Sequence, residues 1–361
     1  MKILAIETSC DETSAAIIEA KKDDLKVKIL ANFTASSLSL HAKTGGIIPE
    51  TAAREQIKYI LPVIEKALNS IPRINNQNIE ESIDAIAVTI GPGLIGSLLV
   101  GVKTAKTLSY VWNKPIIQVN HLIGHIYANF IRGNSKFETR NSKLNTKRSK
   151  PDTDIEFPAT VLIVSGGHTD LLLMKNHEKI IWLGGTRDDA AGEAFDKIGR
   201  ILNLPYPGGP NIEIAALKGN ENAINFPRPL IKSDDFDFSF SGLKTAALRE
   251  IQKRKLNVKD VEDISASVQK AIVDVLIKKT LKAAQKYNTK SILLAGGVAA
   301  NQKLRDQFES EIRNLKLEIP LFVPQKWLCT DNAAMIGAAA FFTGKKTPWR
   351  KIATNPELYF N

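Results

Sequence analysis

The chain has 361 residues, 43% hydrophobic and 24% charged, which is enough for two ordinary domains and excludes a disordered chain or a fibrous repeat. Its formal charge of +11 and pI near 9.4 favour polyanionic partners such as nucleic acid, although a basic solubility feature would give the same balance. Two cysteines exclude a disulfide framework, and the lack of a signal peptide or of an apolar run of roughly 18 residues indicates a cytoplasmic protein without a membrane span.

Short apolar runs that end in polar or glycine-rich turns predict buried strands. They lie at 3–6, 85–90, 116–119, 160–164 and 292–295. Helical patterns lie between them, at 55–68, 98–111 and 264–287. This alternation predicts an α/β fold, with ligand groups gathered where the strands end.

A basic stretch interrupts this order at 132–150, where seven Lys or Arg accompany one Glu and apolar residues are few. Such a composition is typical of a flexible loop, and we expect one over about 132–157. A solvated insertion without a role and an arm that touches phosphates would both explain it.

The first chemical motif is IETSCDETS at 6–14, where an apolar strand runs into hydroxyl and acidic residues. A hairpin of this kind can offer amides and hydroxyls to a phosphate, and the carboxylates of Asp11 and Glu12 to a metal or water, although a plain turn explains the pattern equally. The next motif, GPGLIGS at 91–97, predicts either an anion site at a helix N-terminus or a tight turn with Ser97 near the cap.

The motif HLIGH places His121 and His125 four residues apart. On a helix they project from one face, so two imidazoles there can bind one ion. The glutamate that follows the first histidine in zinc peptidases is absent, which removes the general base for peptide hydrolysis. A histidine pair without a ligand is the alternative, but two of only five histidines in the chain fall together here, after a predicted strand.

Two glycine-rich turns, SGGHT at 165–169 and AGGVAAN at 295–301, each follow a predicted strand. Glycine lets the backbone approach a ligand closely, and two such turns can enclose a nucleotide. Together they indicate a nucleotide site of the actin, hexokinase and Hsp70 kind.

An acidic motif, DDAAGEAFDK at 188–197, puts Glu193 and Asp196 three residues apart on a predicted helix. Those carboxylates could receive ribose hydroxyls. For Asp188 and Asp189 we expect an ordinary solvated acidic face.

The last motif, CTDNAAM at 329–335, opens a helix of small residues. Thr330 or Asp331 is the expected N-cap, which would give the aspartate a purely structural task. Alternatively, Asp331 is a third ligand of an ion held by the two histidines, because two His and one carboxylate form a recognised open metal site.

Ten segments, in this order along the chain, closely resemble the TsaD family of tRNA-modifying enzymes, from residue 1 to about 344. They are SCDETS, GGIIPE, GPGLIGSLLVG, NHLIGH, LIVSGGHT, DDAAGEAFDK, YPGGP, FSFSGLKTA, GGVAAN and CTDNAAMI. The SCDETS and GGIIPE forms resemble the bacterial or organellar type, so the expected location is the cytoplasm or, in a eukaryote, an organelle.

The resemblance implies an actin-like ATPase fold with two related domains flanking a nucleotide cleft, 1–120 plus about 325–361 and 121–324. It also implies transfer of the threonylcarbamoyl group of L-threonylcarbamoyl-adenylate to the exocyclic amine of the adenosine 3′ of the anticodon. The tRNAs would be those that read ANN codons, and AMP would leave.

By the same resemblance, one divalent metal ion, iron rather than zinc, would be held by His121, His125 and Asp331, and Glu12 with Asp11 would face the reacting group as catalytic residues. The adenylate would be lined by Ile163, Val164, Ser165, Gly166, Gly167, Asp196, Gly209, Glu213 and Asn301. A Lewis-acidic ion would polarise the carbonyl for attack by a weakly nucleophilic amine. Many bacterial relatives have an acidic residue where this chain has Ile123, which would alter hydrogen bonding around the site without removing a ligand.

The implied partners are tRNA, a TsaB-like paralogous subunit and a TsaE-like P-loop ATPase, with no membrane. Three other functions compete with this one. A kinase of the same fold would not need the histidine pair, and a glycoprotein peptidase lacks its glutamate here. A non-catalytic scaffold would be expected to have lost the metal ligands and several glycine turns, all of which this sequence keeps.

Overall fold

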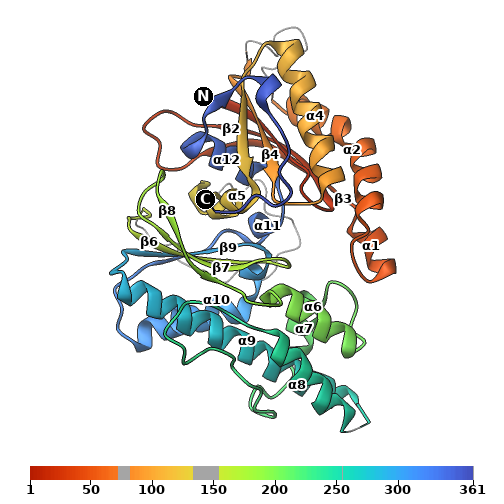
Figure 1. Cartoon of the computed structure of the whole chain (residues 1–361), viewed down its shortest axis with the longest axis vertical. Coiled ribbons are helices and arrows are strands. Elements are labelled where there is room, and N and C mark those ends of the chain that lie inside the picture. The colour runs from red at the N-terminus through yellow and green to blue at the C-terminus, as the bar shows by residue number, and fades with distance from the viewer. Residues whose placement is uncertain (72–81, 133–153, 254, 361) are drawn as a thin grey trace. The chain divides into compact units, whose positions relative to one another are not determined.

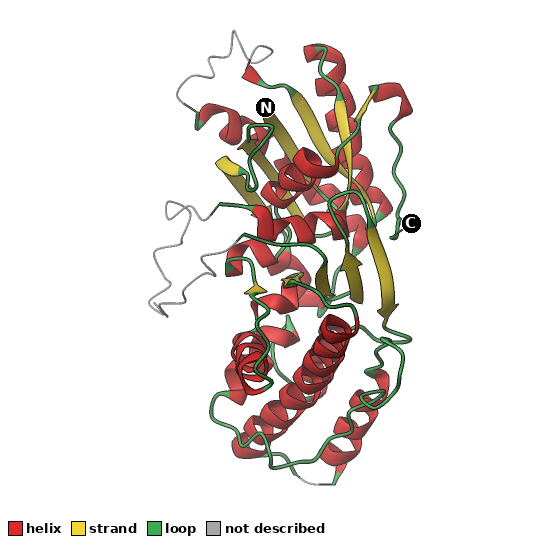
Figure 2. Cartoon of the chain, turned by 90° about the vertical axis from the view of Figure 1, so that its left-hand side faces the viewer, coloured by secondary structure: helices red, strands yellow, loops and turns green. Residues whose placement is uncertain are grey.

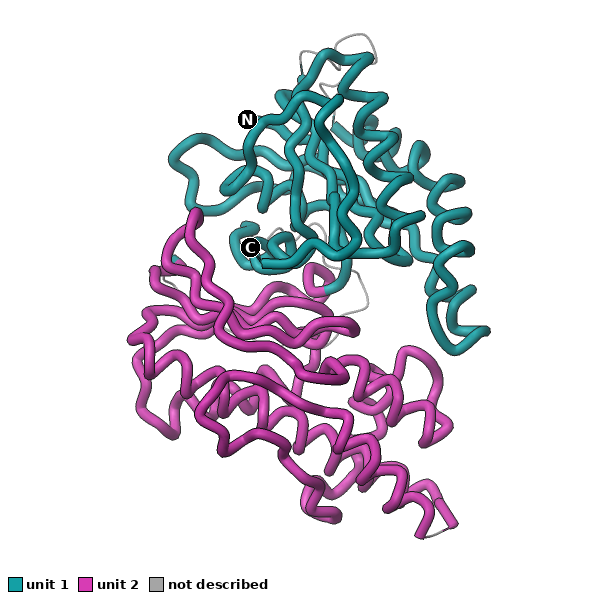
Figure 3. The backbone as a smooth tube through the Cα atoms, viewed as in Figure 1, with its two compact units in different colours: residues 1–154, 330–361 teal, residues 155–329 magenta. Residues whose placement is uncertain are grey.

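The computed structural model describes residues 1–71, 82–132, 154–253 and 255–360, which fall into two compact units (Figure 3). Unit 1 is 1–154 with 330–361, and unit 2 is 155–329. These breaks lie later in the chain than the expected ones after 120 and 324, because the helix that carries the two histidines packs within unit 1. The predicted basic loop falls almost wholly on 133–153, outside the described residues.

Unit 1 is built on a six-stranded sheet in the order β11-β5-β4-β1-β2-β3 (Figure 1). Its strands are β1 (Lys2–Glu7), β2 (Glu12–Glu19), β3 (Lys28–Ser36), β4 (Ala85–Gly91), β5 (Ile116–Asn120) and β11 (Lys346–Thr347). The first three form an antiparallel meander, β4 and β5 run parallel to β1, and β11 pairs antiparallel with the edge of β5. The apolar runs are strands buried on both faces.

Helices cover both faces of this sheet, so their packing explains why its central strands are apolar throughout. On one face lie α2 (Pro49–Asn69) and α4 (Ile95–Trp112), and on the other lie α5 (His121–Tyr127) and α12 (Ala333–Thr343), as Figure 1 shows. The short elements of this unit are α1 (Leu38–Thr44), η1 (Ala128–Phe130) and η4 (Trp349–Lys351).

Unit 2 repeats the topology with a five-stranded sheet in the order β10-β9-β6-β7-β8. Its strands are β6 (Ala159–Val164), β7 (Thr169–Met174), β8 (Ile180–Gly185), β9 (Ser291–Ala295) and β10 (Leu321–Phe322). Here too three strands form an antiparallel meander and the last two run parallel to the first. Counting strands from the start of each unit, both sheets therefore read 3-2-1-4-5, with β11 as the addition in unit 1.

The helices of unit 2 enclose its main hydrophobic core together with the sheet. They are α6 (Ala191–Ile201), α7 (Gly208–Ala216), α8 (Ser241–Gln252), α9 (Val258–Lys286), α10 (Gln302–Asn314), α11 (Lys326–Cys329) and the turn η3 (Gly297–Ala300). Helix α9 packs on β6, and α10 packs on α9. An Asn257 capping box begins α9, where the side chains of Asn257 and Asp260 each accept the other residue's backbone N–H.

The five predicted strands and three predicted helices are all confirmed, with ends that differ by a few residues (Figure 2). Of the other strands, β2 is the second strand of the hairpin expected at 6–14, whereas β3, β7, β8, β10 and β11 were not among the predicted elements. Within the described part of the chain, no helix has both the length and the apolar character needed to cross a membrane.

Candidate metal centre and nucleotide loops

Helix α5 begins at His121 because Asn120, the last residue of β5, caps it. The Asn120 side chain accepts hydrogen bonds from the backbone N–H groups of Leu122 at 2.8 Å and Ile123 at 3.4 Å. The predicted helical spacing of the histidines is confirmed, with ring centroids of His121 and His125 4.7 Å apart. The two imidazoles therefore share one helix face at the carboxyl end of a parallel strand.

The N-cap of α12 is Asn332, so the expected cap at Thr330 or Asp331 is wrong. The Asn332 side chain accepts from the N–H of Met335, and Ser14 on β2 accepts from the N–H of Ala333. Since Asn332 does the capping, the Asp331 carboxylate is free to turn toward the histidines.

The Asp331 carboxylate joins the two imidazoles within unit 1. Its Oδ1 lies 3.5 Å from His121 Nε2 and 3.2 Å from His125 Nε2. One ligand atom from each of the three residues falls within 4.8 Å of the others. Two imidazole nitrogens and one carboxylate oxygen form a donor set suited to a divalent transition metal with open positions.

Gly124 lets α5 approach α12 closely enough for this arrangement. A Cβ atom at Gly124 would lie 2.6 Å from Cδ1 of Ile336 on α12. The small residues on both helices thus bring together ligands that are far apart in the sequence.

Glu7, which the sequence analysis did not select, lies behind His121. The fully buried carboxylate at the end of β1 accepts from the Ser9 N–H at 2.5 Å and the Thr89 hydroxyl at 2.5 Å, and its Oε2 lies 3.1 Å from His121 Nδ1. A proton on Nδ1 donated to Glu7 leaves the Nε2 lone pair facing Asp331, which is the tautomer a metal ligand needs. The sequence signal for Glu7 was a carboxylate at the end of an apolar strand.

The charges of the centre favour an ionised aspartate and a protonated His121 when no ion is bound. Burial would raise the pKa of Asp331, but His121 and His125 outweigh burial and hold that pKa below its ordinary value. Burial would likewise lower the pKa of His121, but the carboxylates of Asp331 and Glu7 raise it to about 9. His125 Nδ1 is buried and has no hydrogen-bond partner among the described residues. A cation between the imidazoles and Asp331 would replace this proton, so the residues fit a metal ion.

Of the predicted catalytic carboxylates, Asp11 lies on the β1–β2 turn and Glu12 begins β2, in the same unit. Burial and then the Ser36 hydrogen bond and the charges of Asp11 and Asp331 set the pKa of Glu12, with a net rise to about 7. Burial and the Asp331 charge also raise the pKa of Asp11. Glu12 Oε2 is buried without a hydrogen-bond partner among the described residues. A group near neutral protonation is suited to proton transfer.

The GPGLIGS turn packs against the β1–β2 turn. The N–H of Leu94 donates to the Ser9 carbonyl at 2.8 Å, and the Ser97 hydroxyl donates to the Cys10 carbonyl at 3.2 Å. A Cβ at Gly93, whose φ is +153°, would lie 2.5 Å from the Ser9 oxygen. Ser97 is within α4 and does not cap it, since the N-cap position is Leu94.

In unit 2 the two glycine turns follow the neighbouring parallel strands β6 and β9. A Cβ at Gly296, whose φ is +86°, would lie 2.5 Å from the Val164 carbonyl oxygen, so the second turn packs tightly on the first. Gly166, Gly167 and Gly297 instead have open space where a Cβ would stand. Ile163 and Val164 are fully buried in β6, so their side chains belong to the core.

The remaining predicted adenylate residues form a connected set in unit 2. Asp196 Oδ1 accepts the N–H groups of Gly208 at 2.7 Å and Gly209 at 3.3 Å, which caps α7 from outside. Glu213 Oε1 accepts the N–H of Gln302 at 2.6 Å, next to the buried Asn301. A hollow of about 440 Å³ beside Glu213 and Gln302 leaves room for a ligand.

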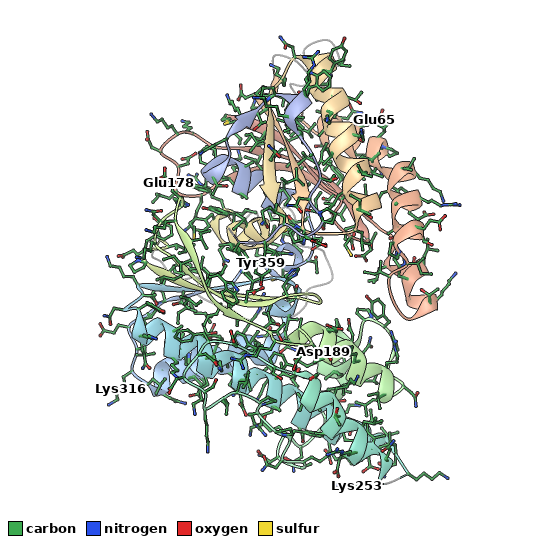
Figure 4. The ribbon with its side chains drawn as sticks, in the orientation of Figure 1. Glu65, Glu178, Asp189, Lys253, Lys316 and Tyr359 are labelled. Carbon is green, nitrogen blue, oxygen red and sulfur yellow. The ribbon has the colours of Figure 1, made fainter. Side chains whose placement is uncertain are left out.

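Asp188 is exposed and Asp189 half-buried, but both precede α6 and both are partnered, so the expected solvated acidic face of a helix is only partly confirmed. Asp188 accepts the backbone N–H groups of Phe240 and Ser241 and the hydroxyls of Ser239 and Ser241, so it caps the start of α8. Asp189, labelled in Figure 4, accepts from Lys197 Nζ at 2.7 Å. Glu193 also pairs with Lys197, at 2.8 Å.

Comparisons with known proteins agree with this arrangement. A family model described as TsaD, tRNA N6-adenosine threonylcarbamoyltransferase, matches residues 28–139 and 143–338. A tRNA N6-adenosine threonylcarbamoyltransferase of Syntrophomonas wolfei is 48% identical, over 94% of this chain and 91% of its own. Proteins of the same name from Moorella thermoacetica, over 99% and 97% of the two chains, and Bacillus subtilis, over 96% and 91%, are 45% and 44% identical.

Solved structures establish the fold. HypF of T. kodakarensis superposes with a TM-score of 0.59 at 14% identity, over 94% of this chain and 47% of that one. A full-length HypF in a phosphate- and nucleotide-bound form gives 0.55 at 11% identity, over 94% and 46%. The predicted actin-like α/β fold is confirmed.

Proposed function

The chain belongs to the TsaD family of tRNA N6-adenosine threonylcarbamoyltransferases and is a transferase, and on this premise we propose the reaction it performs. It transfers the threonylcarbamoyl group of L-threonylcarbamoyl-adenylate to N6 of the adenosine 3′ of the anticodon, in tRNAs that read ANN codons. The amine nitrogen attacks the carbamoyl carbon, the bond from that carbon to the phosphate oxygen breaks, AMP leaves, and N6 loses one proton. The tRNA substrate makes the cytoplasm its site of action.

The observation that carries this proposal is the cluster of His121, His125 and Asp331 with Glu7 behind it. These residues would hold one divalent ion, for which two imidazoles and one carboxylate are a suitable donor set. Iron rather than zinc is proposed on the resemblance to the TsaD family alone. When bound, the ion would act as a Lewis acid that polarises the carbonyl and stabilises the negative charge that develops on it. Glu7 fixes the His121 ring and its tautomer for that task.

The adenylate is proposed to bind through unit 2. The open glycines 166, 167 and 297 admit backbone contact with phosphate, and the Asp196 to Gly209 and Glu213 to Gln302 bonds hold the surrounding helix starts in place. Glu12 is the proposed acceptor of the amine proton, because burial and, to a smaller extent, the negative charge of Asp11 raise its pKa to about 7.

A TsaB-like subunit is proposed to dock on α2 and the first turns of α4, and a TsaE-like P-loop ATPase to join that assembly. Two apolar pairs are exposed at helical spacing on these adjacent helices. Ile57 and Leu61 on α2 are 65% and 62% exposed, and Ile95 and Leu99 on α4 are 51% and 39% exposed. Exposed apolar residues gathered on neighbouring helices mark an interaction face.

The experiment combines the chain and its partners with threonylcarbamoyl-adenylate and unmodified tRNA, and measures modified adenosine by nucleoside mass spectrometry. Product is expected from the wild type and not from His121→Ala, while His177→Ala, a histidine of unit 2 outside the centre, serves as the matched control. No product from an assembled, metal-loaded wild type would contradict the proposal and return attention to the kinase or scaffold alternatives.

A further inference from the structure

Two long segments of unit 1 contain no acidic residue. Neither 85–137 nor 332–356 has an Asp or Glu. Their described cations, apart from Arg132 and Lys106, are Lys103, Lys114, Lys345, Lys346, Arg350 and Lys351. Together with Tyr110 and Trp349, these six residues are called the basic aromatic surface below.

The fold brings the two segments together. Strand β11 pairs with β5, setting Lys346 opposite Ile117, and η4 packs on α4. Lys106 Nζ donates to the Ile352 carbonyl at 2.9 Å and fastens α4 to the chain after η4. Charges from both segments therefore meet on one face of unit 1.

These cations keep their charge available. Other cations of unit 1 pair with carboxylates, such as Lys2 with Glu19 and Lys26 with Asp154. Among the described residues, no carboxylate lies within ion-pair distance of any of the six. Since unpaired positive charge is costly to concentrate, such a surface suits a polyanion.

A hollow of about 500 Å³ lies in this surface, lined in part by Tyr110, Lys114, Trp349 and Arg350. Tyr110 is 68% exposed and stands edge to face with Trp349, their ring centroids 5.7 Å apart. The Arg350 guanidinium lies 4.5 Å from the Trp349 ring centroid. Exposed aromatic rings among cations are the platforms on which single-stranded nucleic acids stack their bases.

We propose that the basic aromatic surface binds the RNA substrate, with phosphates on the cations and one unpaired base against Tyr110. The inference rests on the proposed function, because it needs an RNA substrate. Lysine is depleted at protein–protein interfaces, so a surface with five lysines favours RNA over a protein partner.

Strand β5 relates this surface to the metal centre. Lys114 and Pro115 precede the strand and His121 follows it. Pro115 and His121 are six residues apart, so about 20 Å separates them at a rise of about 3.3 Å per residue. An RNA whose adenosine lies at His121 can thus reach the surface within unit 1.

The test measures binding of a fluorescently labelled, unmodified tRNA transcript to the full chain by anisotropy at several salt concentrations. Arg350→Ala/Lys351→Ala is expected to raise the Kd about tenfold near 0.1 M salt and to lower the slope of log K against log salt by roughly 2. The matched control, Lys175→Ala/Lys179→Ala, removes the same charge from the β7–β8 turn of unit 2, where Figure 4 labels Glu178.

A third variant, Tyr110→Ala, is expected to raise the Kd by about fivefold or more with the salt slope unchanged, because it removes stacking and no charge. Its melting temperature should match that of the wild type, since the ring is largely exposed. A Kd within twofold of wild type for Arg350→Ala/Lys351→Ala, an equal loss in the control, or no effect of Tyr110→Ala would overturn the proposal.

Transfer assays separate this inference from the proposed function. With saturating tRNA, the surface variants should keep the single-turnover rate of the wild type and differ only in the tRNA concentration required. If the wild type binds tRNA through this surface but makes no threonylcarbamoyl-adenosine, the RNA surface stands and the proposed reaction fails.

Discussion

Strand β1 of unit 1 and strand β6 of unit 2 hold the same place in sheets of the same order, yet they end in opposite ways. Strand β1 ends in Glu7, whose buried carboxylate faces His121, and Asp11 on the following turn is succeeded by Glu12 at the start of β2. Strand β6 ends at Val164, and the turn after it carries two glycines with open space around them. The same sheet topology thus positions charged side chains in unit 1 and a backbone that a ligand can contact in unit 2.

The glycines at the ends of the fourth strands also differ between the two units. Both β4 and β9 lead into a glycine with positive φ, Gly91 at +156° and Gly296 at +86°. A Cβ atom at Gly91 would clash with the Asn355 carbonyl, whereas a Cβ atom at Gly296 would clash with the Val164 carbonyl of the neighbouring turn. A shared topology fixes where the turns stand, and the side chains and close contacts around them decide their chemistry.

The largest effect should come from Asp331→Asn, which removes a metal ligand from unit 1 and leaves unit 2 unchanged. Losing the charged ligand should empty the metal centre and slow transfer by about a thousandfold, since Lewis-acid stabilisation is worth about 4 kcal/mol. Metal content by mass spectrometry and single-turnover assays check this. The exposed Asp23→Asn is the control, and loss of nucleotide binding along with the metal would contradict the separation of tasks.

The next effect should arise in unit 2 from Gly296→Ala. A Cβ there meets the Val164 carbonyl at 2.5 Å in a backbone conformation that alanine disfavours, so we expect a loss of about 3 kcal/mol in the free energy of unfolding. Urea denaturation measures it. Gly297→Ala, one residue later in open space, should change stability little, and equal losses in both variants would refute the role of the close contact.

Glu7→Gln should weaken metal binding by about 10- to 100-fold without unfolding unit 1, because the amide holds the His121 tautomer less firmly. Chelator competition gives the affinity directly, independent of activity. Glu65→Gln changes an exposed carboxylate on α2 of the same unit (Figure 4) and should leave the affinity unchanged. An unaltered metal affinity in Glu7→Gln would mean that Glu7 does not position His121 for the metal.

The smallest effect concerns pH. Glu12 has a pKa of about 7 in the folded chain and 4.5 as its ordinary value, so the folded state binds more protons than the unfolded state between these values. Its stabilising contribution is present below pH 4.5 and is lost as pH rises through 7. Relative to Glu12→Gln, the wild type should lose unfolding free energy as the pH rises across this window.

Denaturation with a chelator present, from pH 4.5 to pH 8, checks this prediction. Parallel profiles for the wild type and Glu12→Gln would show that Glu12 is already ionised in the folded chain, and the proposed proton acceptor would then need revision.

Much of the fold could be predicted because its signals are local. The runs at 3–6 and 160–164 are apolar since β1 and β6 are buried on both faces, and the period of 264–287 follows one helix. The partly exposed strand β3 gave a weaker signal, because its alternating burial admits polar residues. The spacing of His121 and His125 is likewise a property of a single helix.

The sequence by itself determined the five strands with apolar runs, the helix that holds the two histidines, and the glycine turns, because hydropathy, spacing and backbone freedom act over a few residues. Only the tertiary structure decided that Asp331 faces His121, that Asn332 caps α12 in its place, and that Glu7 stands behind the imidazole. These contacts depend on how α5 and α12 pack on one sheet, with Gly124 allowing their approach. No local pattern encodes which distant side chains such packing brings within hydrogen-bond distance.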